Sequence, residues 1–277
     1  MRVRAFAKIN RSLRVLGTRG DGYHELRTIF PSIALHDPLT IRPSRGPLRL
    51  TCDDPACPAD ERNLVWQAAA RMWAAAGRRG APRGLAIDLI KRIPMQAGLG
   101  GGSSDAAATL RALAKRWHVN DDKVRAAAVA LGADVPYFLE GGTVLGLERG
   151  DLLFPLIDPP AAPVVLVLPD FGVGTKEAFG WFDRDPDRVA LRSRGEMVND
   201  LEDPVISHHP AIGRIISALR KAGASQTSMS GSGSAVFGLF SSRTVALAAA
   251  KRLASASRRV LVSKTLNRQR YQTLAGR

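Results

Sequence analysis

Alternating apolar and polar residues dominate the first part of the chain, and this pattern is typical of β-strands. Residues 2–16 alternate well enough to predict a strand, and further strands are predicted at 26–35, 48–51 and 84–93. Residues 62–76 instead carry apolar side chains at helical spacing and end at a glycine, which predicts a helix. The first part of the chain therefore combines several strands with helices.

The second part of the chain shows the same mixture. Further helices are predicted at about 103–116, 121–131, 175–182, 210–222 and 243–256, and further strands at 143–148, 164–168, 234–240 and 259–263. A proline-rich segment at 156–163 predicts a boundary between a first domain, 1–157, and a second, 158–277. Because both parts mix helices and strands, the predicted fold class is α+β.

The composition is that of an ordinary globular protein. Of the 277 residues, 45% are hydrophobic and 23% are charged, and no apolar stretch approaches the roughly 18 residues of a membrane span. The basic N-terminus is not followed by an apolar run, so no secretory signal is predicted and a cytoplasmic location is expected. Cys52 and Cys57 are too few for a disulfide framework or a zinc site and are interpreted as incidental thiols.

The net charge of +15 is concentrated at the C-terminal end. After Asp203 there are twelve Lys or Arg residues and no acidic residue. A nucleic-acid-binding protein has such a charge, and so does a protein that handles several phosphates. No basic run exceeds two residues and only 6% of the residues are aromatic, so nucleic acid is the less favoured partner.

The strongest local signal is a glycine-rich loop between a predicted strand and a predicted helix. Four of the five residues from Gly98 to Gly102 are glycine, which suits a backbone that approaches a ligand closely. Ser103 or Ser104 is expected to cap the following helix, whose free N–H groups form an anion site. The segment lacks the lysine of a Walker A motif and the last glycine of a dinucleotide-binding motif. Backbone amides and serine hydroxyls are therefore expected to hold the phosphate, with a cation supplied from elsewhere.

Two charged residues stand in apolar surroundings. Lys8 lies on the first predicted strand and needs a carboxylate or an anion if it is buried, whereas at a sheet edge it would reach solvent. Asp134 lies between Gly132 and Phe138, where a carboxylate either caps a helix or takes part in chemistry. The sequence pattern alone leaves both alternatives open.

Three further motifs are compatible with simple turns. Residues 19–24 combine glycines with a tyrosine and a histidine, and residues 228–234 form a second glycine- and serine-rich loop. Either segment could bind a ligand or form a plain turn. Asp170-Phe171-Gly172 matches the magnesium motif of protein kinases, but no His-Arg-Asp catalytic loop precedes it, so a turn is predicted there.

In combination, these motifs resemble the GHMP kinase superfamily. The matching segments are Lys8–Asn10, Asp21–His24, Gly98–Asp105, Gly132–Pro136 and Met229–Gly233. The resemblance implies an N-terminal domain similar to domain 2 of ribosomal protein S5 and a ferredoxin-like C-terminal domain. The Asp-Gly-Tyr-His segment is similar to that of the branch that binds a cytidine nucleotide. That branch implies ATP-dependent phosphorylation of the 2-hydroxyl of 4-diphosphocytidyl-2-C-methyl-D-erythritol, in non-mevalonate isoprenoid precursor biosynthesis.

The resemblance also implies roles for the catalytic and ATP-binding residues. Asp134 is expected to take the proton of the hydroxyl, with Lys8 as its ionic partner near the transferred phosphoryl group. Asn63 is expected at the adenine end of ATP, and Mg²⁺ is expected with ATP, with Ser104 as one ligand and the others unassigned. The ATP phosphates are expected to lie on Pro94, Met95, Gln96, Ala97, Gly98, Leu99, Gly100, Gly101, Gly102, Ser103 and Ser104.

The substrate contacts implied by the resemblance lie in three other segments. Asn10 is expected to contact the substrate, whereas Tyr23, His24 and Phe179 are expected to hold the cytidine base. A homoserine or mevalonate kinase of the same superfamily, which has no cytosine to hold, is the nearest alternative. A non-enzymatic RNA-binding protein is an alternative from a different class, and in it Lys8 and Asp134 would be dispensable.

Overall fold

The computed structural model describes residues 1–185 and 198–276. Its strands are β1 (Arg2–Lys8), β2 (Ser12–Thr18), β3 (His24–Pro47), β4 (Arg49–Cys52), β5 (Arg83–Leu89), β6 (Thr143–Glu148), β7 (Leu152–Pro155), β8 (Pro163–Pro169), β9 (Gln226–Met229), β10 (Val236–Leu239) and β11 (Arg258–Leu266). Its helices are α1 (Leu64–Ala75), α2 (Gly101–Trp117), α3 (Asp121–Leu131), α4 (Tyr137–Glu140), α5 (Thr175–Arg184), α6 (Glu202–His208), α7 (Pro210–Lys221), α8 (Arg243–Leu253) and α9 (Arg268–Ala275).

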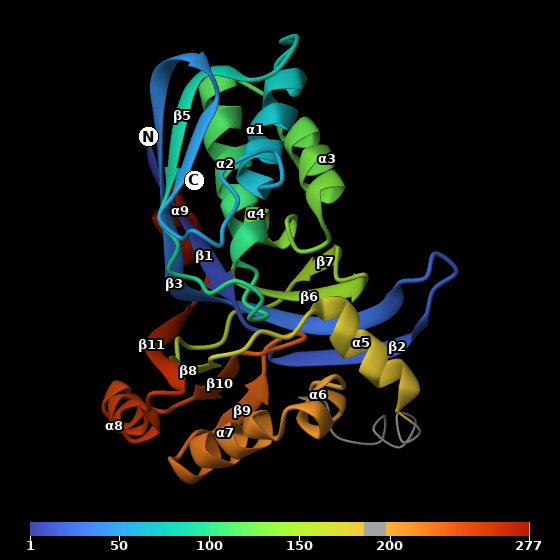
Figure 1. Ribbon diagram of the computed structural model, residues 1–277, viewed down its shortest axis with the longest axis vertical. Coiled ribbons are helices and arrows are strands. Elements are labelled where there is room, and N and C mark those ends of the chain that lie inside the picture. Colours follow the sequence, from blue (N-terminus) through green and yellow to red (C-terminus); the bar gives the residue numbers. More distant parts are fainter. Residues whose placement is uncertain (186–197, 277) are drawn as a thin grey trace.

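The long strand β3 connects most of the sheet. Its N-terminal part pairs with β2 and β6, and its C-terminal part pairs with β1 and β5. At Ser32 and Ile33 it also pairs with β11, which continues the sheet through β8 and β10 to β9. The main path of the sheet is β4-β5-β3-β11-β8-β10-β9, and it runs through the molecule from top to bottom in Figure 1.

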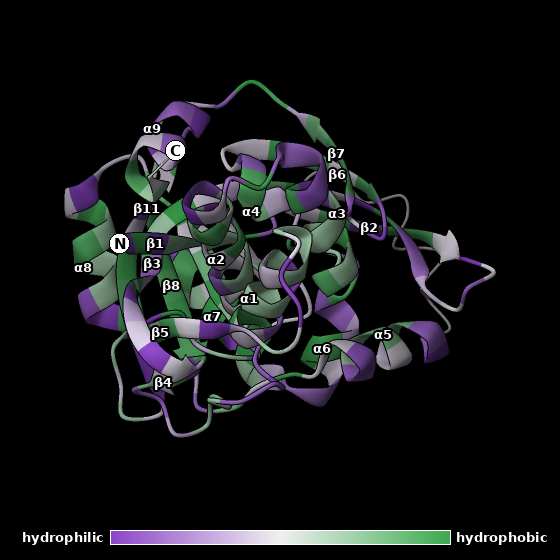
Figure 2. Cartoon of the chain, turned by 90° about the horizontal axis from the view of Figure 1, so that it is seen from above, coloured by the Kyte–Doolittle hydropathy of each residue, from purple (hydrophilic) through white to green (hydrophobic). Residues whose placement is uncertain are grey.

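Two sets of helices cover the sheet, each over its own apolar cluster. Near the top of Figure 1, α1, α2 and α3 pack together against β1, β3 and β5, with alanine, leucine and isoleucine side chains between them. Near the bottom, α7 and α8 cover β8 and β10. Residues 164–168 of β8 are all buried, and this strand is green in Figure 2 because every one of them is valine or leucine. Burial of apolar area at about 25 cal/mol per Å² is the main force that holds these layers together.

The last helix, α9, returns to the first half of the chain. Tyr271 of α9 is fully buried beside Phe6 of β1, and their ring centroids are 5.5 Å apart. The hydroxyl of Tyr271 donates a hydrogen bond of 2.6 Å to the carbonyl oxygen of Phe138. A connection without regular structure, residues 156–162, joins β7 to β8. The division of the chain at 157/158 stays a prediction.

The α+β fold class is confirmed, and most predicted elements are present. The helix predicted at 121–131 and the strand predicted at 143–148 begin and end at the same residues as α3 and β6. The single strand predicted at 2–16 is wrong, because residues 9–11 leave the ladder where the chain changes partners along β3. The elements α4, β7, α6, β9 and α9 are short or weakly patterned, and the sequence does not predict them. No helix in residues 1–185 or 198–276 is long and apolar enough to span a bilayer.

Candidate active site

The glycine-rich loop leads into α2 two residues earlier than the sequence pattern predicts. Gly100 is the N-cap of α2, in the left-handed conformation with φ 70°, and no side chain caps the helix. The expected cap by Ser103 or Ser104 is therefore wrong, since both residues lie inside the helix. The first backbone bond runs from the Ser104 N–H to the Gly100 carbonyl oxygen. The N–H groups of residues 101–103 thus have no partner within the helix, which makes this end of α2 a suitable anion site.

The glycines in this loop are required by close packing. A Cβ on Gly98 would lie 1.9 Å from the carbonyl oxygen of Ser230, and a Cβ on Gly100 would lie 2.6 Å from the ring of Phe138. Both residues also have positive φ, which favours glycine. Gly102, in contrast, is exposed, and the nearest neighbour of a Cβ there would be 3.7 Å away. The sequence therefore uses glycine here both for close packing and for an open backbone.

The second glycine-serine loop, residues 228–234, packs directly against the first. The Ser230 hydroxyl donates to the Gly98 carbonyl oxygen at 2.8 Å and accepts from the Asn10 N–H at 3.1 Å. Asn199 holds the same loop by donating to the carbonyl oxygens of Met229 and Gly231, each at 2.8 Å. This loop is therefore not a plain turn, because it braces the glycine-rich loop and the end of β1.

Lys8 is buried at the C-terminal end of β1, beside the glycine-rich loop. Its backbone N–H donates to the carbonyl oxygen of Leu99, and its ammonium donates to Asn10 Oδ1 and lies 3.8 Å from Asp134 Oδ2. Burial lowers the pKa of Lys8, and the negative charge of Asp134 acts in the opposite direction. An edge-strand lysine that reaches solvent is thus excluded.

Asp134 faces this ammonium from the turn between α3 and α4. Its side chain is 36% exposed, compared with 5% for that of Lys8. It does not cap α4, whose N-cap is Pro136. A partly exposed carboxylate next to a buried ammonium and an uncapped helix end can orient a hydroxyl group close to a bound phosphate.

At the other end of the site, the structure brings His24 and Phe179 together. Their rings are stacked, with centroids 4.5 Å apart and an interplanar angle of 20°. His24 Nε2 lies 2.8 Å from Asp183 Oδ1, on the same helix as Phe179. Tyr23 does not join this stack, since its ring lies 5.5 Å from the guanidinium of Arg149 and the residue is 58% exposed. Asp170 follows β8 in a bend, as predicted.

Comparisons with known proteins show to which family this chain belongs. The family models "GHMP kinases N terminal domain" and "GHMP kinases C terminal" match residues 63–142 and 183–258. A 4-diphosphocytidyl-2-C-methyl-D-erythritol kinase from Deinococcus radiodurans is 42% identical over 266 residues, which cover 90% of this chain and 87% of that protein. The enzyme of the same name from Prosthecochloris aestuarii is 40% identical over 92% of this chain and 94% of its own. This chain belongs to the 4-diphosphocytidyl-2-C-methyl-D-erythritol kinases, within the GHMP kinases.

Solved structures agree with this membership. The crystal structure of a 4-(cytidine 5'-diphospho)-2C-methyl-D-erythritol kinase is 36% identical, covers 96% of this chain and 99% of its own, and superposes with a TM-score of 0.82. Crystal structures of a mevalonate kinase and of the homoserine kinase from Cytophaga hutchinsonii both have TM-scores of 0.70. Their identities are only 13% and 20%, so these two share the fold of the diphosphocytidyl-methylerythritol kinases.

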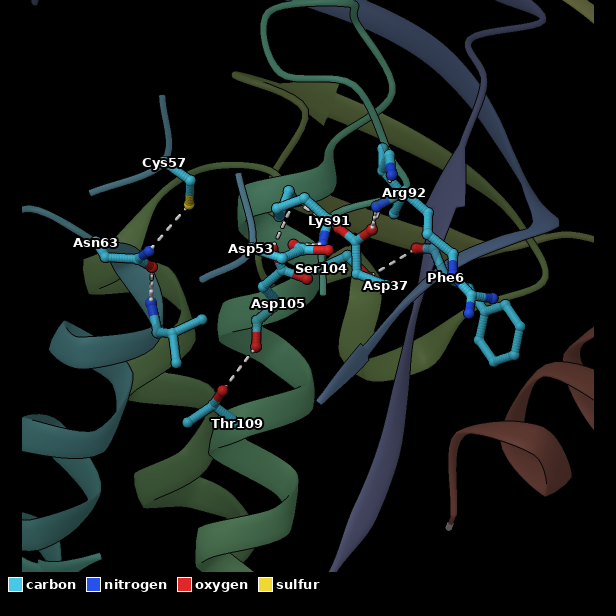
Figure 3. Close-up of polar contacts among 12 residues, drawn as sticks. Phe6, Asp37, Asp53, Cys57, Asn63, Lys91, Arg92, Ser104, Asp105 and Thr109 are labelled. Atoms are coloured by element: carbon cyan, nitrogen blue, oxygen red, sulfur yellow. Dashed lines mark hydrogen bonds and ion pairs between the residues drawn. The ribbon is translucent and has the colours of Figure 1, made fainter. Parts of the chain in front are cut away.

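The fold of this kinase places a buried lysine, which the sequence pattern does not single out, near the first turn of α2. Lys91 Nζ lies 2.5 Å from Asp37 Oδ2 and 2.8 Å from Asp105 Oδ2, between two buried carboxylates (Figure 3). Burial by itself lowers the pKa of Lys91, but the two carboxylates together outweigh it and raise the pKa above the usual value. The same ammonium would lie 3.2 Å from a Cβ on Gly101. Lys91 is thus a buried ammonium close to the phosphate loop that is already paired with two carboxylates. The supply of a cation to the phosphates stays a prediction.

The sequence pattern does not single out Lys91, because it predicts a strand over 84–93 in which Lys91 is an ordinary polar position. In the structure this strand, β5, ends at Leu89. The Ile90 N–H still donates to the Pro38 carbonyl oxygen of β3, and aspartate side chains take over from Lys91 onwards. Asp53 accepts from the N–H of Lys91, and Asp37 accepts from those of the next two residues. An aspartate at position 37, inside the mostly apolar segment 29–41, was the available signal. Its completely buried carboxylate needs a cation, and Lys91 provides it.

Asn63 has a structural role. Its Oδ1 accepts from the Val65 N–H at 2.8 Å, so that it caps α1, and its Nδ2 donates to the Pro58 carbonyl oxygen at 2.6 Å and to Cys57 Sγ at 3.3 Å (Figure 3). A contact of Asn63 with adenine stays a prediction. Cys57 and Cys52 are both free thiols. Burial and the neighbouring Cys52 raise the pKa of Cys57 to about 12, so this thiol is protonated at neutral pH.

Residues 1–185 and 198–276 do not form a ligand set for Mg²⁺. The hydroxyl of Ser104 is buried and donates to the carbonyl oxygen of Phe6 at 2.7 Å (Figure 3). The part of the chain that the structure describes contains no group of three His, Cys, Asp or Glu side chains able to hold a metal ion. An octahedral Mg²⁺ that enters with ATP would therefore have to rely on phosphate oxygens and water for most of its ligands.

Proposed function

We propose that this chain transfers the γ-phosphoryl group of ATP to the 2-hydroxyl of 4-diphosphocytidyl-2-C-methyl-D-erythritol, a step of non-mevalonate isoprenoid precursor biosynthesis. The observation that carries the proposal is the Lys8–Asp134 pair, 3.8 Å apart, beside the uncapped N-terminus of α2. Phosphoryl transfer needs an oriented acceptor and stabilised negative charge more than covalent chemistry, and this pair can provide both. The names of the relatives supply the substrate.

ATP binds with its phosphates on the loop 94–104. The N–H groups of residues 101–103 and the positive end of the α2 dipole face the phosphate oxygens. Lys91 lies close to the first turn of the helix, but because Asp37 and Asp105 both pair with it, this group of three side chains adds no net positive charge there. The net charge of +15 makes the general field attractive to a substrate and a cosubstrate that are both polyanions.

The acceptor hydroxyl lies on Asp134. Its carboxylate accepts the hydroxyl hydrogen bond, aims the oxygen at the γ-phosphorus and takes the proton as the new bond forms. The ammonium of Lys8 keeps Asp134 oriented and stabilises the negative charge that develops on the transferred group. Asn10 fixes the position of this ammonium, and the Asn10 amide itself donates to the Thr28 hydroxyl at 2.7 Å.

The cytidine end of the substrate lies against His24 and Phe179, with Tyr23 as the outer aromatic. The phenyl ring of Phe179 provides a planar aromatic surface on which a base can stack, and the imidazole of His24 lies against the same ring. Tyr23 has to leave the guanidinium of Arg149 to join them, and its exposure makes that movement inexpensive. A cytoplasmic location and the lack of a nucleic-acid partner go with this function as further predictions.

A coupled ADP-release assay tests the proposal. The purified protein is incubated with ATP, Mg²⁺ and 4-diphosphocytidyl-2-C-methyl-D-erythritol, and homoserine and mevalonate are run in parallel. Turnover with the cytidyl substrate alone is expected. Turnover with another alcohol only would contradict the assigned substrate, while lack of ATP binding would contradict the kinase assignment itself.

A further inference from the structure

The position of His24 is fixed from three directions by residues of α5. Its Nε2 lies 2.8 Å from Asp183 Oδ1, and its ring stacks on that of Phe179. The rings of His24 and Phe182 are nearly perpendicular, with centroids 6.5 Å apart and an interplanar angle of 83°. Only 12% of the His24 side chain is exposed, whereas Asp183 is 46% exposed. Asp183 comes from a part of the sequence 159 residues away from His24.

The contact with Asp183 determines which nitrogen of a neutral His24 carries the proton. An ionised carboxylate can only accept hydrogen bonds, so Nε2 must carry the hydrogen that is shared with Asp183. In the neutral imidazole Nδ1 is then an acceptor with a free lone pair. Within residues 1–185 and 198–276, Nδ1 of His24 has no hydrogen-bond partner. A ligand can therefore use it.

A hydrogen-bond acceptor distinguishes the two pyrimidines. Cytosine presents an amino group, a donor, at the position where uracil presents a carbonyl oxygen, an acceptor. An Nδ1 lone pair attracts the first and repels the second. We propose that Asp183 is a positioning residue that holds His24 as the Nε2–H tautomer and thereby makes the base site select cytidine over uridine nucleotides. This inference rests on the proposed function, because it concerns the base of that substrate.

Asp183→Asn is the decisive variant. The amide can accept from Nε2–H or donate to a bare Nε2, so it no longer imposes one tautomer. The kcat/KM ratio of the cytidyl substrate over its uridyl analogue is expected to fall about tenfold, the value of one hydrogen bond. The loss should appear in the KM for the cytidyl substrate, with kcat and the KM for ATP unchanged. Asp183→Glu, which keeps an acceptor-only group, should retain most of the selectivity.

Two controls separate positioning from a general structural effect. Glu177→Gln removes the same charge from the exposed surface of the same helix, and its selectivity should equal that of the wild type. Two-bond ¹H–¹⁵N spectra of ¹⁵N-histidine-labelled protein report the tautomer directly, without substrate. The wild type should show the Nε2–H pattern at His24, and Asp183→Asn should show a mixture of both tautomers.

The outcomes distinguish this inference from the proposed function. An Nδ1–H pattern in the wild type, or unchanged selectivity in Asp183→Asn, would overturn the role of Asp183 even if the enzyme uses the cytidyl substrate well. A wild type that shows the Nε2–H pattern but does not phosphorylate the cytidyl substrate would leave the tautomer assignment standing and remove its connection with cytidine.

Discussion

Replacing Lys8 with methionine shows how the buried charge affects kcat and how it affects the stability of the fold. Methionine retains most of the side-chain volume, so the substitution removes the ammonium without leaving a large cavity. At 3.8 Å and an effective dielectric constant of 20, the attraction between Lys8 and Asp134 is about 4 kcal/mol. Because the Asp134 side chain is 36% exposed, solvent screening lowers that attraction.

The expected effect on activity is large. Loss of one preorganised group that stabilises developing charge lowers kcat by roughly 10²- to 10³-fold. An ammonium that acts on a developing negative charge at a similar distance supplies about 4 kcal/mol before screening, which is the size that such a loss needs. Steady-state ADP release should show this loss in kcat, with KM values changed only a few-fold. Lys251→Met, which removes an exposed lysine on α8, is the matched control and should leave kcat unchanged. A Lys8→Met enzyme within fivefold of the wild-type kcat would refute the role given to Lys8.

The same Lys8→Met substitution should raise the free energy of unfolding. Burial lowers the pKa of Lys8 in the folded state, so the unfolded state binds this proton more tightly. The charged lysine therefore destabilises the fold at every pH below its folded pKa, and the wild type regains stability as the pH rises from the folded pKa towards 10.5. Lys8→Met should unfold at a higher temperature than the wild type at neutral pH. The difference should shrink by about 1.4 kcal/mol per pH unit between the two pKa values.

Three further substitutions test the other parts of the site. Asp134→Ala should lower kcat by orders of magnitude with the Kd for ATP unchanged in a calorimetric titration, and a fully active variant would remove its assigned role. Phe179→Leu should raise the KM for the cytidyl substrate about tenfold at constant kcat, because stacking on an aromatic ring is worth roughly 1–3 kcal/mol per base; unchanged kinetics would exclude the ring from the base site. Gly102→Val should raise the KM for ATP at least tenfold while the melting temperature stays within a few degrees, since a Cβ at this exposed position meets no atom closer than 3.7 Å. Gly101→Val is a poorer probe because its Cβ would lie 3.0 Å from Ile93, and normal ATP kinetics in Gly102→Val would contradict the phosphate cradle.

Local patterns in the sequence predicted much of this molecule correctly. The loop 98–102 contains more glycine than any packed element tolerates, and the loop indeed combines positive φ angles with close contacts. Helices such as 121–131 were predicted within a residue, because spacing of apolar residues and capping by a residue like Asn120 act over a few positions only. Lys8 and Asp134 could each be recognised as unusual because a charge in apolar surroundings is costly.

What each charge faces was decided by the tertiary structure. The strand predicted at 84–93 is too long at its C-terminal end, because aspartates from β3 and from the loop after β4 replace the backbone partners from Lys91 onwards. The same is true of the break at residues 9–11, where β1 and β2 use different parts of β3. These are contacts between residues far apart in the chain, and no local pattern encodes them.

The sequence by itself determined the residue types of the site and the local conformations that display them. Only the fold brought Lys8 to Asp134, Ser230 to Gly98 and His24 to Asp183, across separations of more than a hundred residues. The physical reason is one of range. Backbone sterics and apolar periodicity act over a few residues, whereas the pairing of buried charges depends on which strands share a sheet.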